Sequence, residues 1–152
     1  MDALNVDALD VDALPAGALL LVDSAPIIYT LEANEHFATR FAPLFQRHAD
    51  GGIALAVSTV TIAEVLTGPL EASEEALAKR YRAALESWQV VELTADIAES
   101  AARLRGQYGL KLPDAIQLAS ALAINADALV THDRDFSKVR GVKIVTWLIR
   151  DR

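Results

Sequence analysis

Five short and mostly apolar runs, separated by longer amphipathic segments, constrain the fold of this chain more than any other feature. They span residues 18–22, 53–57, 88–93, 128–130 and 142–145. Short apolar runs of this kind are typical of strands that are buried on both faces. Strands that alternate with helices form a mostly parallel sheet through right-handed crossovers. The alternation therefore predicts an α/β fold with about five strands, covered by helices on both faces.

The chain of 152 residues is long enough for one domain with a core of its own. Residues 1–17 differ from the rest, because Asp-Ala-Leu occurs there three times, at 2–4, 7–9 and 12–14. A period of five fits neither a helix face nor a strand face. We therefore predict an acidic N-terminal extension, partly disordered or draped over the surface, and a single domain over residues 18–152.

The composition bears on compartment and on partners. Cysteine is absent, so a disulfide framework and a thiolate metal site are both excluded, and a reducing compartment is the simpler inference. The acidic N-terminus lacks the basic start of a secretory signal, and the apolar stretch at 13–22 is too short to span a bilayer. We expect a cytoplasmic protein that does not enter a membrane. The hydrophobic fraction of 53% also suggests that a partner covers part of the surface.

The formal net charge is 14 basic minus 21 acidic residues, or −7. This balance argues against tight, sequence-blind binding of nucleic acid, which normally shows as a basic face. It leaves open a local basic groove, or an acidic pocket that metal ions neutralise. Lys79, Arg80 and Arg82 lie on an amphipathic helix, where a solvated face is the default interpretation and a substrate-facing patch the alternative.

Three carboxylates follow the ends of predicted strands. Asp23 comes directly after the first run, Glu64 shortly after the second and Asp133 after the fourth. In parallel sheets, ligands bind beyond the carboxyl ends of the strands. A fourth acid, Asp114, lies in the first turn of the helix predicted for 112–125, where Pro113 suits a first helical position. These acids are candidates for one shared site.

Each acid also has a structural explanation that involves no ligand. Asp23 or Ser24 could cap the following helix, Thr61 and Glu64 have the spacing of a capping box, and a first-turn acid complements the helix dipole. Those explanations do not account for three acids at strand ends. Clustered carboxylates raise one another's pKa unless a divalent cation is bound.

Oxygen ligands suit Mg²⁺ or Mn²⁺, whereas no cysteine and only three histidines are present for zinc. Such an ion can position a phosphodiester, activate a water and neutralise charge in the transition state.

Four motifs surround these acids. They are Val22-Asp23-Ser24-Ala25-Pro26-Ile27-Ile28-Tyr29, Ser58-Thr59-Val60-Thr61-Ile62-Ala63-Glu64-Val65-Leu66-Thr67-Gly68, Leu112-Pro113-Asp114-Ala115-Ile116-Gln117-Leu118-Ala119 and Thr131-His132-Asp133-Arg134-Asp135-Phe136. In this order they resemble the motifs of the PIN-domain family, and within it those of the VapC-type ribonuclease toxins of prokaryotic toxin–antitoxin pairs. The resemblance covers roughly residues 18–148, and the acidic extension before it is a departure from the family pattern.

The resemblance implies a three-layer α/β/α sandwich and a Mg²⁺- or Mn²⁺-dependent endoribonuclease that cleaves single-stranded RNA. It also implies homodimerisation and inhibition by a cognate antitoxin. By position, Asp23, Glu64 and Asp114 match the first three acids of the family, as catalytic residues and metal ligands. Asp133 is the choice for the fourth acid, with Asp135 as its competitor. The hydroxyls that would support the site belong to Ser24 and Thr131.

Three other functions would also place acids at strand ends or helix starts. A PIN-type nuclease that processes RNA without an antitoxin shares all of these residues. A non-catalytic binding module would use every acid as a cap. A phosphoryl-accepting signalling domain needs an acceptor aspartate after its third strand and a lysine after its fifth, and the segments 91–94 and 145–147 supply neither.

An aromatic stripe on the helix predicted for 34–48, formed by Phe37, Phe41 and Phe45, could be core or interface, and core is the commoner case.

Overall fold

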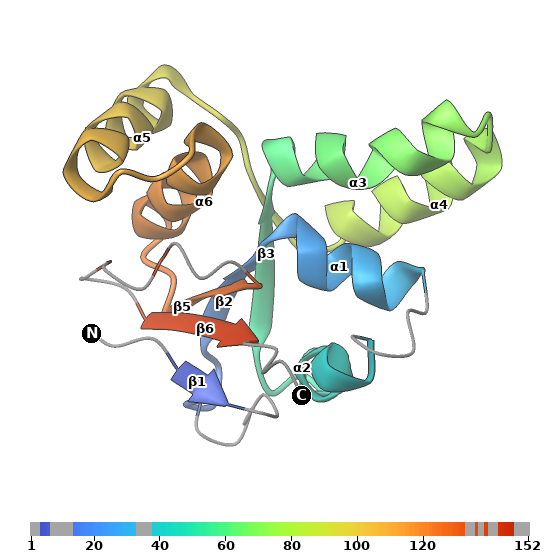
Figure 1. Cartoon of the computed structure of the whole chain (residues 1–152). Coiled ribbons are helices and arrows are strands. Elements are labelled where there is room, and N and C mark those ends of the chain that lie inside the picture. Colours follow the sequence, from blue (N-terminus) through green and yellow to red (C-terminus); the bar gives the residue numbers. More distant parts are fainter. Residues whose placement is uncertain are drawn as a thin grey trace, which may run out of the picture.

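The structure is a computed structural model that describes residues 4–6, 14–32, 38–132, 136, 139 and 143–147, with side chains described for 14–32, 42–132, 136 and 139. Within these ranges strands and helices alternate along most of the chain (Figure 1). The strands are β1 (Leu4–Val6), β2 (Leu19–Val22), β3 (Ala54–Ser58), β4 (Gln89–Val91), β5 (Ala128–Thr131) and β6 (Lys143–Trp147). The helices are α1 (Ser24–Leu31), α2 (Ala38–Ala49), α3 (Thr59–Glu71), α4 (Glu75–Glu86), α5 (Ala95–Tyr108) and α6 (Leu112–Ala123).

The strands form one sheet in the order β1-β6-β5-β2-β3-β4, and every pairing is parallel. Leu21 on the central strand β2 lies beside Ala56 on β3 and Leu129 on β5. Because the strands run in the same direction, β2, β3 and β5 all end at one edge of the sheet. The predicted parallel α/β fold is confirmed, although the described residues form six strands rather than about five.

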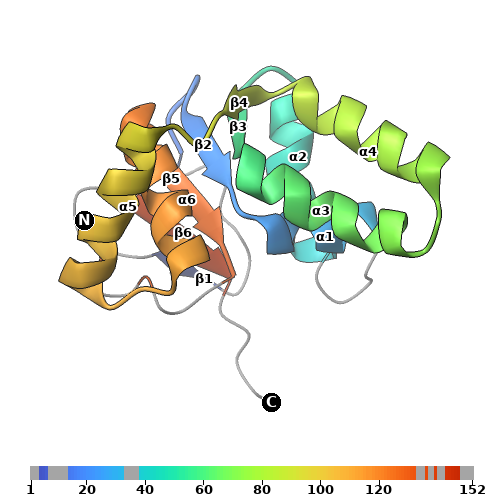
Figure 2. The ribbon, with the colours of Figure 1, turned by 90° about the horizontal axis from the view of Figure 1, so that it is seen from above.

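Alternate residues of each central strand face opposite layers of helices. On β2, Leu20 and Val22 belong to a buried cluster with residues of α1 to α4, whereas Leu21 belongs to a second cluster with residues of α5 and α6. Figure 2 shows the sheet between these two groups of helices. The predicted three-layer α/β/α sandwich is therefore confirmed. Its two cores explain why the strands read as unbroken apolar runs.

The N-terminal extension differs from expectation in two places. Leu4–Val6 forms the edge strand β1, which pairs with β6, and Leu14 is only 3% exposed within the first core cluster. The Leu14 carbonyl also accepts a hydrogen bond of 3.0 Å from Arg47 Nη2. The prediction of a segment merely draped over the surface is therefore wrong for these residues. An edge strand of three residues is too short for periodicity to reveal, and a neighbouring strand supplies its hydrogen bonds. The predicted boundary at residue 17, between an N-terminal extension and the domain, stays a prediction.

The helix α3 passes through Gly68-Pro69, where the sequence predicted its end. It continues to Glu71, and Pro69 is buried. Proline removes one helical hydrogen bond, and that loss is tolerated here within the last turn, where Ala72 N–H bonds to the Gly68 carbonyl.

Of the aromatic stripe, Phe45 is half-buried and stacks on Trp88 at a ring-centroid distance of 6.0 Å. The side chains of Phe37 and Phe41 lie outside the described residues.

None of the helices in the described ranges is both long enough and apolar enough to cross a bilayer.

Candidate functional site

Asp23 lies at the carboxyl edge of the sheet, between β2 and α1. It is the N-cap of α1, and its Oδ1 accepts a hydrogen bond of 2.7 Å from the Ser24 backbone N–H. Its Oδ2 accepts a second bond, of 2.9 Å, from the Thr131 hydroxyl at the end of β5. The Asp23 N–H donates to the Val130 carbonyl at 2.8 Å. A carboxylate can accept about four bonds, so its capping role does not exclude a second role for Asp23.

Glu64 lies in the second turn of α3. The N-cap of this helix is Ser58, whose side chain accepts the Thr61 N–H at 3.1 Å. The predicted capping box, with Thr61 as the cap and Glu64 reaching back to it, is therefore wrong, because the helix begins three residues earlier than that box requires. Glu64 has no capping role that would explain it.

Glu64 and Asp23 interact electrostatically, although they come from different elements. The pKa of Glu64 is raised above its ordinary value. Burial is the largest cause of this increase, and the negative charge of Asp23 adds to it. A hydrogen bond from the Ser24 side chain acts in the opposite direction and lowers this pKa. The fold thus brings together two of the predicted acids, Asp23 and Glu64, with the two predicted supporting residues, Ser24 and Thr131. We call Asp23 and Glu64 the acidic pair.

Asp114 is the third residue of α6 and is only 8% exposed. Pro113 occupies the second helical position rather than the predicted first, and the N-cap residue Lys111 makes no capping bond with its side chain. The carboxylate therefore lies at the positive end of the helix dipole. The helix α6 itself contacts β2 and β5, the strands that lead to Asp23 and Thr131.

The described residues do not complete the predicted metal site. Among them, no three Asp, Glu, His or Cys side chains lie close enough to hold a metal ion. Asp133 and Asp135 lie outside the described residues, so the fourth acid stays a prediction. The acidic pair is the part of the predicted site that the structure brings together, and the place of Asp114 beside it stays a prediction.

A buried polar network lies at the start of α3, one helical turn before Glu64, and the sequence alone did not reveal it. Ser58 Oγ is 3.3 Å from Thr61 Oγ1 and 3.1 Å from Gln117 Oε1, and Gln117 Nε2 donates to Thr61 Oγ1. All three side chains are buried. The available signal was Gln117 itself, a polar residue among the apolar residues of a buried helix face.

A second contact that the sequence did not predict joins α1 to the end of β5. The Tyr29 hydroxyl lies 3.2 Å from His132 Nδ1, and the two rings meet edge to face. Burial raises the pKa of Tyr29. His132 directly follows Thr131, so this contact holds the start of the loop beyond β5 against the helix that Asp23 caps.

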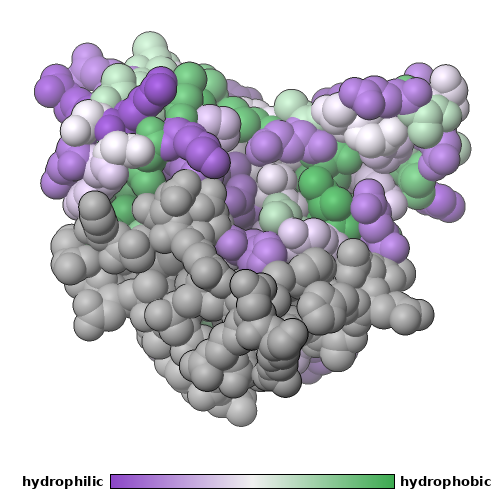
Figure 3. All heavy atoms as spheres, viewed as in Figure 1, coloured by the Kyte–Doolittle hydropathy of each residue, from purple (hydrophilic) through white to green (hydrophobic). Residues whose placement is uncertain are grey.

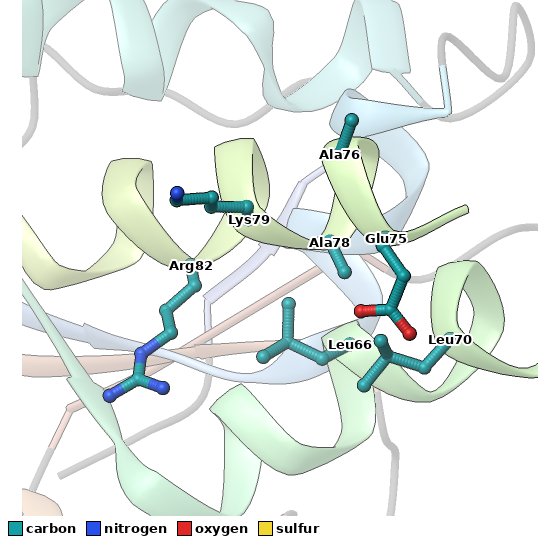
Figure 4. Close-up of a pocket in the computed structure, with 7 residues that line it drawn as sticks. All are labelled: Leu66, Leu70, Glu75, Ala76, Ala78, Lys79 and Arg82. Carbon is teal, nitrogen blue, oxygen red and sulfur yellow. The ribbon is translucent and has the colours of Figure 1, made fainter. Parts of the chain in front are cut away.

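The surface has a hollow and a separate apolar pocket. Figure 3 shows the hollow between the lobe formed by α5 and α6 and the lobe formed by α3 and α4. Within the second lobe, a pocket of about 390 Å³ lies between α3 and α4 (Figure 4). Leu66 and Leu70 line it together with Lys79 and Arg82, and neither acid of the pair does. Arg82 also forms an exposed ion pair with Glu86 at 3.1 Å.

Comparison with known proteins identifies the family. The model of the PIN domain matches residues 20–142, most of the chain. The chain belongs to the PIN domain family. A search of curated protein sequences gave no match.

Solved structures resemble this PIN domain over nearly their whole length. A toxin–antitoxin complex from Klebsiella pneumoniae is 31% identical, with 81% of this chain and 94% of that chain covered and a TM-score of 0.64. VapBC2 from Rickettsia felis, bound to a promoter DNA fragment, is 18% identical with coverage of 85% and 98% and a TM-score of 0.67. VapC20 from Mycobacterium tuberculosis, a toxin that cleaves the sarcin-ricin loop, is 19% identical with coverage of 78% and 92% and a TM-score of 0.63. The last two likenesses show the fold alone.

Proposed function

We propose that this PIN domain is a Mg²⁺- or Mn²⁺-dependent endoribonuclease that cleaves single-stranded RNA and acts as the toxin of a VapBC-type toxin–antitoxin pair. The observation that carries the proposal is the acidic pair at the carboxyl edge of a PIN-family sheet, with the Thr131 hydroxyl bonded to Asp23. The similarity to a toxin–antitoxin complex at 31% identity supports the toxin role and an antitoxin partner.

The residues present fit a hard divalent cation. Two carboxylates that interact electrostatically, one with a raised pKa, repel each other, and a cation between them would relieve that repulsion. Carboxylate and hydroxyl oxygens are the ligands that Mg²⁺ and Mn²⁺ prefer. Asp23 and Glu64 would hold the ion, and we assign Asp114 and either Asp133 or Asp135 as the acids that would complete its ligands. When bound, the ion would position the phosphodiester, activate a water and neutralise charge in the transition state.

The residues around Asp23 contribute preorganisation. The Ser24 N–H fixes one carboxylate oxygen and the Thr131 hydroxyl fixes the other, so the carboxylate cannot rotate freely. Groups held in place before the reaction lose no orientational freedom during it, which lowers the barrier. Thr131 and Ser24 therefore act as supporting residues that orient the acidic pair.

Divalent metal should be required for cleavage. Purified protein incubated with single-stranded RNAs should cleave them with Mg²⁺ or Mn²⁺ and stop when EDTA is added, because the acidic pair alone repels phosphate. Cleavage is followed by gel electrophoresis of end-labelled RNA. Persistent cleavage in EDTA would contradict the metal dependence, and no cleavage of any RNA with either metal would favour the binding-module alternative. Growth arrest on expression, relieved by a co-expressed antitoxin, separates a toxin from an RNA-processing nuclease.

The raised pKa of Glu64 predicts an effect on stability with a definite sign. A carboxyl whose pKa is raised by folding stabilises the folded state below the ordinary value of 4.5, and this contribution is lost as the pH rises through the raised pKa. Glu64→Gln should therefore raise the free energy of unfolding at pH 7 in EDTA and leave it unchanged below pH 4. The gain should be well under about 1 kcal/mol, because the residue is exposed enough for solvent to screen it.

Urea unfolding at the two pH values measures this effect, and saturating Mg²⁺ supplies the control. Bound metal should stabilise the wild-type protein more than the Gln variant, because only the wild type offers a carboxylate at this position. A Glu64→Gln variant that is less stable than wild type at pH 7 in EDTA would show that the charge of Glu64 stabilises the fold.

A further inference from the structure

The buried network of Ser58, Thr61 and Gln117 joins two helices that lie on opposite faces of the sheet. Ser58 and Thr61 lie at the end of β3 and the start of α3, whose Val65 belongs to the first core cluster. Gln117 is on α6, whose Leu118 belongs to the second cluster. The sheet separates these two cores, so apolar packing relates α3 to α6 only indirectly, through the strands that both cores share. The network connects them directly, past the carboxyl end of β3.

Each end of the network lies one helical turn from a predicted site acid. Thr61 precedes Glu64 by three residues on α3, and Gln117 follows Asp114 by three residues on α6. Residues three apart lie on the same side of a helix, so a shift of the network moves the neighbouring acid with it. The network thus connects the turn that carries Glu64 to the turn that carries Asp114.

An amide is the side chain that this junction requires. Gln117 accepts a bond from Ser58 through Oε1 and donates one to Thr61 through Nε2, and its exposed fraction is only 1%. A buried amide contributes less to stability than an apolar residue of similar size unless its bonds are all made. Its neighbours on the helix, Ala115 and Leu118, are fully buried and apolar. A satisfied polar group in this position specifies one arrangement of the two helices, because only that arrangement pairs both of its ends.

We propose that Gln117 is a positioning residue that, through Ser58 and Thr61, sets the spacing between Asp114 and Glu64 and thereby the divalent-cation affinity of the site. The inference rests on the proposed function, since it assigns these two acids to one cation. Gln117 touches neither the substrate nor the metal in this scheme. It acts by holding the first turn of α3 and the second turn of α6 in register across the end of the sheet.

The test compares variants that break the network with one that does not. Gln117→Met removes both bonds at nearly constant volume, and Thr61→Val removes the hydroxyl while keeping the shape. Ser120→Ala is the matched control, because Ser120 is also buried on α6 and its hydroxyl donates to the Ile116 carbonyl of its own helix at 2.7 Å. Thr61→Ser retains the hydroxyl and serves as the conservative variant.

The readout is Mn²⁺ affinity, measured by EPR titration of the free ion without RNA, beside urea unfolding of the same samples. Gln117→Met and Thr61→Val should bind Mn²⁺ about 10-fold more weakly or worse, the size of effect seen when residues that orient metal ligands are removed. Ser120→Ala and Thr61→Ser should bind as the wild type does. Variants that lose stability without losing affinity would show a merely structural role.

Two results would overturn the inference, and they differ. If the wild type binds Mn²⁺ and cleaves RNA, and Gln117→Met and Thr61→Val bind Mn²⁺ as tightly as Ser120→Ala, the network does not position the acids and the proposed function stands. If the wild type binds no Mn²⁺ and cleaves no RNA, the proposed function fails and the inference fails with it.

Discussion

Asp23→Asn is expected to slow RNA cleavage by about 1000-fold or more while the protein stays folded. The asparagine side chain has the same size and keeps an oxygen that can accept the Ser24 N–H, so the start of α1 is preserved. It loses the negative charge that would bind the cation and that receives the Thr131 hydroxyl. Cleavage of labelled RNA under single-turnover conditions measures the loss, and circular dichroism checks the fold.

Asp127→Asn is the matched control for this substitution. Asp127 also accepts a backbone N–H, that of Leu19 at 2.8 Å, but it lies before β5, at the opposite end of the strands from Asp23. Its variant should cleave RNA at the wild-type rate. Unimpaired cleavage by Asp23→Asn would remove Asp23 from the catalytic residues, and equal losses in both variants would indicate general damage to the sheet.

Asp114→Asn should slow RNA cleavage by a factor similar to that of Asp23→Asn. The reason is that the buried carboxylate of Asp114, at the start of α6, is assigned to the same cation. The competing explanation is that Asp114 only complements the helix dipole, a role worth about 0.3–1 kcal/mol at a surface. Asp96 supplies the comparison, since it is the acidic residue in the first turn of α5 and is exposed.

The two variants separate the explanations when both are measured for cleavage and for unfolding. Asp96→Asn should lose a few tenths of a kcal/mol in the free energy of unfolding and no activity. Asp114→Asn should lose cleavage and Mn²⁺ binding whatever happens to its stability. If both variants cleave RNA at the wild-type rate, Asp114 has only the dipole role and the catalytic assignment must exclude it.

The sheet and part of the candidate site could be predicted because they depend on local pattern and strand direction. Parallel strands bring their carboxyl ends together, so Asp23 and Thr131 meet although they are far apart in the chain. The features that escaped prediction depend on tertiary contacts. Pro69 is tolerated in α3 because it lies in the last turn of the helix, and its side chain is buried there, which the Gly-Pro pair does not reveal.

The role of Gln117 was equally out of reach of periodicity. Its partners are Ser58 at the end of β3 and Thr61 at the start of α3, and no pattern within α6 shows how α6 meets them. The capping box at Thr61 and Glu64 failed for a related reason. Its spacing was present, but Ser58 offered a cap three residues earlier, at the end of the strand.

The pairing of β1 with β6 ties the first strand of the described residues to the last, with Leu4 beside Val145 (Figure 1). During synthesis, therefore, β1 emerges before the many residues that separate it from β6, and it has no partner until those residues have been made. A contact so distant in sequence carries a large loop-closure cost and tends to form late.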